Sequence, residues 1–102
     1  MQIEILCIDG CPHVDETREL VGDVVAQLGV EADIETVEVS TDRQARELDF
    51  RGSPSVRVDG TDIQPDVDER TTVGRGCRVY STSDGTSGVP PKEMVASAVH
   101  EA

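Results

Sequence analysis

Aromatic side chains are almost absent from this sequence, which has one Phe, one Tyr and no Trp among its 102 residues. The core must therefore be built from Val, Ile, Leu and Ala, and the length predicts a single domain over residues 1–102. Long apolar runs are absent too, since no stretch approaches the roughly 20 residues that a membrane-spanning helix requires. The first residues lack the basic and apolar segments of a secretory signal. We therefore expect no membrane contact and a cytoplasmic location.

Basic side chains are also scarce. Nine Lys and Arg stand against 21 Asp and Glu, which gives a net charge of −12, and Lys92 is the single lysine. A nucleic-acid partner is not expected, because such a chain would repel phosphate. The acidic residues are spread along the whole sequence. This pattern favours a halophilic protein, whose self-repulsion is screened by a salty cytoplasm. The alternative is an ordinary acidic bacterial protein.

In a cytoplasmic protein, the three cysteines indicate reactive or metal-binding thiols in preference to structural disulfides. Cys11 is the most informative of them. It follows an apolar strand over residues 3–8 and a turn at Gly10, and Pro12 is expected at the first position of a helix. Unpaired N–H groups and the helix dipole there would favour the thiolate, which is the reactive form. The alternative is a buried structural cysteine.

Local signals predict the remaining elements. Apolar residues at helical spacing between residues 14 and 28 predict that the helix opened at Pro12 continues to Gly29, which ends it. The other expected elements are a strand over 34–39, a short helix capped by Thr41 and ending near 48, a strand over 55–58, an Asp59-Gly60 turn into a strand over 61–63, and a helix opened by Pro90-Pro91. Residues 64–89 fit this plan less well. We expect a strand over 78–82 there, and the rest is either a functional lid or an elaboration of the hairpin.

With this element order, the chain resembles the thioredoxin-fold proteins of the glutaredoxin type. Cys11-Pro12-His13-Val14 matches the first two positions of the family's Cys-Pro-x-Cys motif, with Val14 in place of the second cysteine. Pro54, in Gly52-Ser53-Pro54-Ser55-Val56, matches the cis-proline that opens the third strand opposite the active thiol. The resemblance implies a thioredoxin-like α/β fold. Its expected parts are a central mixed sheet of about four strands, three helices, and an extended loop or extra strand at 64–89.

The resemblance also implies thiol–disulfide exchange, with a low-molecular-weight thiol or a protein disulfide as partner and no cofactor. Cys11 would be the nucleophile, and the Ser53 backbone would pair with an extended thiol peptide. Cys77 would either resolve the mixed disulfide or be an ordinary strand residue. The residues expected to contact the substrate are Pro12, His13, Ser53, Pro54, Arg75 and Arg78. Arg75 and Arg78 would attract anionic thiols to Cys77, while His13 would either stabilise a thiolate or point to solvent.

Two other functions stay open at this point. Two thiolates suit a soft ion, so Cys11 with Cys7 or Cys77 would make a mercury-type binding site or serve an organomercurial-handling protein. Cys7 lies within the predicted first strand, however, and this position favours a core residue over a metal ligand or resolving thiol. The third function is a non-catalytic interaction domain with the same fold.

Overall fold

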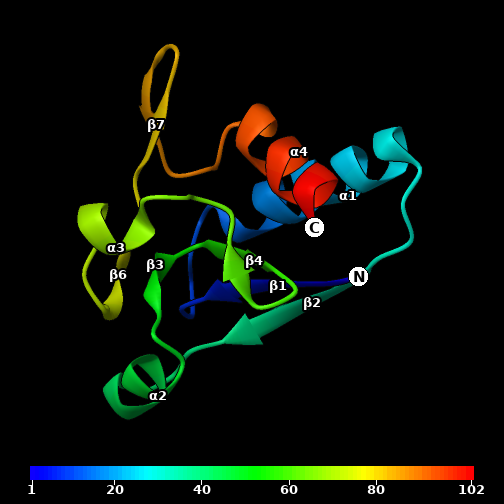
Figure 1. The fold of residues 1–102 in the computed structure, drawn as a ribbon. Helices are drawn as coiled ribbons and strands as arrows, with labels where there is room; N and C mark the ends of the chain where they lie inside the picture. Colours follow the sequence, from blue (N-terminus) through cyan, green and yellow to red (C-terminus); the bar gives the residue numbers. More distant parts are fainter.

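The first half of the chain is a β–α–β unit in the computed structural model, which describes residues 1–102 except the side chains of residues 69 and 70. Strand β1 (Gln2–Cys7) runs parallel to β2 (Asp33–Glu38), and helix α1 (Val14–Leu28) connects them (Figure 1). Gly29 ends α1 with a φ of 66°, a left-handed conformation that suits glycine. These elements confirm the prediction except at the helix start, which we expected at Pro12.

A short helix and a hairpin continue the chain. Helix α2 (Asp42–Glu47) is capped by Thr41, whose side chain accepts a hydrogen bond from the Gln44 N–H at 3.0 Å, as predicted. Strand β4 (Ser55–Val58) is antiparallel to both β1 and β5 (Thr61–Asp62). Asp59 and Gly60 turn between them with φ values of 50° and 87°. Both angles are positive, as a two-residue hairpin turn of type I′ requires.

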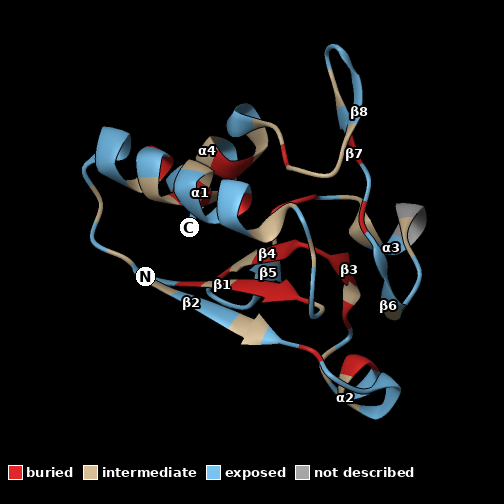
Figure 2. Cartoon of the chain, turned by 180° about the vertical axis from the view of Figure 1, so that it is seen from behind, coloured by how far each residue is buried: buried red, intermediate tan, exposed pale blue. Residues whose placement is uncertain are grey.

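These strands form one mixed sheet in the order β2-β1-β4-β5, so β1 is paired on both sides. Helices α1 and α4 (Lys92–Glu101) pack together on one face, and α2 packs on the other (Figures 1 and 2). The expected α/β class, with a mixed four-stranded sheet and three helices packed on it, is confirmed. No helix in the described part of the chain has the length and apolar character needed to span a bilayer.

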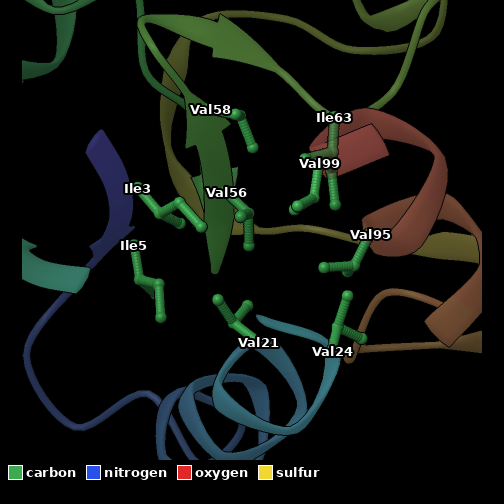
Figure 3. Packing of buried hydrophobic residues seen from close by; sticks show 9 residues of the cluster. All are labelled: Ile3, Ile5, Val21, Val24, Val56, Val58, Ile63, Val95 and Val99. Atoms are coloured by element: carbon green, nitrogen blue, oxygen red, sulfur yellow. The ribbon is translucent and has the colours of Figure 1, made fainter. Parts of the chain in front are cut away.

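The two faces of the sheet have separate cores. The larger one lies under α1 and α4 and is aliphatic throughout (Figure 3). Its buried members are Ile3, Ile5, Val21, Val24, Val56, Val58, Ile63, Val95 and Val99. The smaller one joins Leu6, Val39, Ala45 and Phe50 next to α2. Burying one such side chain contributes about 1.5–3 kcal/mol to the stability of the fold. These clusters therefore fix the position of the end of β1, after which the loop with Cys11 begins.

Residues 64–89 contain more regular structure than the sequence predicted. A single helical turn, α3 (Val67–Arg70), is followed by β6 (Gly74–Cys77) and by a hairpin of β7 (Tyr80–Thr82) and β8 (Gly85–Ser87). The hairpin projects away from the sheet (Figure 1). The predicted strand over 78–82 begins only at Tyr80. An unpredicted strand, β3 (Arg51–Ser53), pairs in parallel with β6 in a second, two-stranded sheet.

Candidate functional site

Cys11 lies in a tight turn between β1 and α1. Gly10 has a φ of 75°, and the Cys11 N–H donates to the Ile8 carbonyl at 3.3 Å. The thiol is free and half-buried. Helix α1 begins only at Val14, with His13 as its N-cap and no side-chain cap. Cys11 therefore precedes the first helical turn instead of lying in it, and the influence of the helix dipole is weaker than we expected because it falls off within one turn.

Ser53 and Pro54 lie against the loop that carries Cys11. The peptide bond between them is cis, and both residues are buried. The Ser53 hydroxyl accepts a hydrogen bond from the Ile8 N–H at 3.0 Å. The Tyr80 hydroxyl donates to the Pro54 carbonyl at 2.6 Å. Ser53 thus holds Ile8 at the start of the Cys11 loop. Tyr80, from the segment 64–89, holds Pro54.

Cys7 is a core residue, as its position in an apolar strand favoured. Only 6% of it is exposed. Burial raises the pKa of Cys7, and the charges of Cys11 and Glu38 raise it further, against an opposing effect of Arg18. The thiol therefore stays protonated at neutral pH and is a poor nucleophile. Because the charge of Cys11 acts on Cys7, the two side chains lie within electrostatic range of one another.

Cys77 ends β6 and is exposed and free. The parallel register places it opposite Ser53, the residue that holds the Cys11 loop. Cys77 also lines a cavity of about 460 Å³ together with Arg51, Gly52 and Gly76. The tertiary structure therefore brings Cys77 next to Ser53, although 24 positions separate them in the sequence.

Arg78 does not face a substrate, contrary to the sequence-based prediction. Its side chain is fully buried and forms two hydrogen bonds with the Asp62 carboxylate, at 2.8 and 2.9 Å. It also donates to Ser55 and Gln64 at 3.0 Å and lies 4.8 Å from the centre of the Tyr80 ring. Burial is the largest effect and lowers the pKa of Arg78, but the hydrogen bond to Asp62 and the charges of Tyr80 and Asp62 together outweigh it and leave the pKa raised. Arg78 is thus a structural cation.

Residues 5–99 match a family described as Domain of unknown function (DUF2703). The chain belongs to this family. No match was found among curated proteins or among solved structures. Any function for this DUF2703 member therefore has to be argued from the geometry of its own site.

Arg75 and Pro12 remain exposed near the site. The Arg75 side chain donates to the Val39 carbonyl at 3.2 Å and retains further donors for a ligand. His13 is half-buried, which argues against the alternative in which it points to solvent. A Cβ atom on Gly88 would lie only 2.3 Å from the His13 ring, so the segment after β8 runs directly over the imidazole.

No group of three or more His, Cys, Asp or Glu side chains is arranged for a metal among the residues that the structure describes. A thiolate site in this part of the chain therefore has at most two such ligands. The residues that sequence reasoning missed are Asp62, Gln64 and Tyr80, which anchor the segment 64–89. A lone acid, amide or tyrosine in a polar segment carries no pairing signal, so nothing in the sequence marked them.

Proposed function

We propose that this protein is a thiol–disulfide oxidoreductase with a thioredoxin-like fold, in which Cys11 is the attacking thiol. The fold assignment is supported by the strand order β2-β1-β4-β5, with β1 and β2 parallel and the other pairs antiparallel. The observation that carries the function is the 3.0 Å hydrogen bond from the Ile8 N–H to Ser53. Through this bond, the buried Ser53-Pro54 corner lies beside the loop of a half-buried, free cysteine.

The reaction has two exchange steps. The Cys11 thiolate attacks one sulfur of a disulfide, so that a new S–S bond forms at Cys11 and the other sulfur leaves as a thiolate, which takes a proton from water. A second thiolate then attacks the mixed disulfide between Cys11 and the substrate. Cys7 is unsuited to this second step because it is buried and protonated. An external thiolate completes the cycle by attacking the substrate sulfur, so that a new small disulfide forms and Cys11 leaves as a thiolate. In the internal alternative, the exposed Cys77 attacks the Cys11 sulfur and releases the substrate thiolate, and external thiols then reduce the resulting Cys11–Cys77 disulfide.

The test is reduction of a small disulfide by the wild type and by Cys11→Ser, Cys77→Ser and Cys7→Ala. We expect Cys11→Ser to abolish the activity, because the attacking sulfur is gone. An unchanged rate in this variant would refute the proposed mechanism. A retained rate in Cys77→Ser indicates a monothiol cycle, whereas an accumulating mixed disulfide in that variant indicates that Cys77 resolves it. Cys7→Ala should retain exchange and controls for the loss of a thiol.

Soft-metal binding is the second candidate, and the electrostatic proximity of Cys7 and Cys11 favours it. Two thiolates suit a soft cation, which would displace the proton of Cys7 on binding. The test is titration of the reduced protein with Hg²⁺, followed by unfolding in urea and alkylation of the thiols that stay free, since burial alone shields Cys7 in the folded protein. Protection of Cys7 and Cys11 together by one equivalent would support this function, and protection of neither would exclude it.

A further inference from the structure

The strand edge that carries the Ser53 carbonyl is already occupied by the protein's own β6. Strand β1 is paired on both sides, so the neighbouring edge belongs to β3. There the Gly74 N–H donates to the Phe50 carbonyl at 3.0 Å, and the Arg78 N–H donates to the Ser53 carbonyl at 2.9 Å. We expected the Ser53 backbone to pair with a substrate peptide, but its carbonyl is taken by Arg78 of the same chain.

Side chains hold β6 firmly in this place. Arg78, the residue directly after β6, is anchored in the buried cluster with Asp62. The fit between the two strands is close, since a Cβ atom on Gly52 would lie 3.2 Å from the Arg78 backbone. Farther along the segment, Gly88 lies on the His13 ring. The segment 64–89 therefore contacts the site region at both β3 and His13, and β6 is an integral part of the site.

An extended peptide binds next to a reactive thiol most readily by adding a strand to a free edge. Because β6 occupies the Ser53 side of β3, and the other side of β3 faces the loop after β1, a peptide could add to this sheet only beyond β6, one strand spacing of about 4.8 Å farther away. Figures 1 and 2 both place β3 between the loop after β1 and β6. Two cysteines form a disulfide only within a Cα separation of about 4.4–6.8 Å. A peptide cysteine displaced by one strand spacing would be shifted by more than the width of this range, and could not form a disulfide with Cys11.

We infer that the Cys11 site acts on low-molecular-weight disulfides and excludes extended polypeptides, and that β6 is the element that imposes this specificity. The inference rests on the proposed exchange at Cys11. Of the two partner classes that the sequence left open, it selects the small thiol. The Cys11 thiolate attacks the small disulfide, one small thiolate leaves, and the Ser53 carbonyl keeps its bond to Arg78 throughout the cycle.

The test compares two uncharged reagents that carry the same pyridyl-activated disulfide. One is the mixed disulfide of 2-mercaptoethanol, and the other is an extended peptide with a single central cysteine. Rate constants for the modification of Cys11 in the folded wild type are measured by peptide mapping. Each is divided by the rate constant for the urea-unfolded protein, which removes differences in the intrinsic reactivity of the two reagents. We expect the normalised rate for the small reagent to be at least about tenfold higher, a factor that corresponds to about 1.4 kcal/mol.

A matched pair of variants tests the role of β6. Gly74→Pro removes the N–H that donates to Phe50, whereas Gly74→Ala keeps it and places its Cβ in open space. We expect the normalised preference to fall toward one in Gly74→Pro and to persist in Gly74→Ala. Equal normalised rates in the wild type would overturn the inference but leave the proposed function intact. Failure of Cys11 to react with either reagent would overturn both.

A second measurement needs no variant and covers the case in which Gly74→Pro does not fold. Amide exchange of Gly74 and Arg78 is followed in wild-type protein before and after incubation with the peptide reagent. We expect both amides to stay protected while Cys11 remains unmodified by the peptide. Rapid peptide attachment to Cys11, with these two amides still protected, would show that β6 does not exclude polypeptides.

Discussion

Removal of the Asp62 carboxylate should destabilise the whole protein, because it leaves the Arg78 cation buried without its counter-charge. The Arg78 side chain is 0% exposed and that of Asp62 is 9% exposed, and the two ion-pair hydrogen bonds measure 2.8 and 2.9 Å. In Asp62→Asn the shape is nearly kept, but the negative charge is lost. Ser55 and Gln64 still accept from the guanidinium, although both are neutral.

The expected magnitude follows from this burial. Breaking a buried ion pair by removing one partner costs about 3–5 kcal/mol, whereas an exposed pair contributes about 0–1 kcal/mol. Because two neutral acceptors remain on Arg78, we expect a loss near the lower end, about 3 kcal/mol. A domain of this size has a free energy of unfolding of roughly 5–15 kcal/mol. At about 4–8 °C per kcal/mol, the melting temperature should fall by about 12–24 °C.

The assay is urea denaturation followed by far-UV circular dichroism, with the free energy of unfolding compared between variants. Glu47→Gln is the control, since Glu47 pairs with Arg43 at 3.0 Å but both side chains are mostly exposed. It should lose less than about 1 kcal/mol. The double variant Asp62→Asn/Arg78→Met removes both charges and should be more stable than Asp62→Asn alone. A loss below about 1 kcal/mol in Asp62→Asn would refute the reasoning.

Two further predictions concern buried groups near the site. Burial raises the pKa of Cys7 above its ordinary value of 9.0. The neutral thiol therefore contributes its full stabilisation of the fold below pH 9.0, and this stabilisation is lost as the pH rises through the pKa of the folded state. Iodoacetamide near neutral pH should therefore label the other two thiols and spare Cys7 until the protein unfolds; equal labelling of all three would contradict its burial. Tyr80→Phe leaves the buried Pro54 carbonyl without its donor and should cost about 1–3 kcal/mol in urea denaturation, and an unchanged stability would show that this hydrogen bond contributes nothing.

Most elements of the main sheet and its helices could be predicted because their signals are local. Gly29 ends α1 and Thr41 caps α2, and each acts on residues within one helical turn. Asp59-Gly60 fixes the β4–β5 hairpin through its own backbone angles. The start of α1 was predicted two residues too early, because Pro12 fits the first helical position but also fits the turn that precedes the helix.

The site was predicted only in part. The sequence singled out Cys11 and Ser53-Pro54, and the structure brings their loops into contact through Ile8. The sequence did not reveal β3 or β6, because both strands are short and their residues show no alternation of apolar and polar side chains. Arg78 was predicted to face a substrate because it directly follows Cys77 in the sequence, where a cation would attract anionic thiols.

The sequence by itself determined the α/β class, the end of α1 at Gly29, the Thr41 cap of α2, the Asp59-Gly60 turn and the turn that holds Cys11. These depend on backbone preferences and on apolar spacing within a few residues. Only the tertiary structure decided that Arg78 is buried against Asp62 and that β6 covers the edge of β3. Partners 16 and 24 positions apart meet only after the sheet and hairpin have formed. Their hydrogen bonds and charges therefore depend on the fold as a whole and leave no local pattern in the chain.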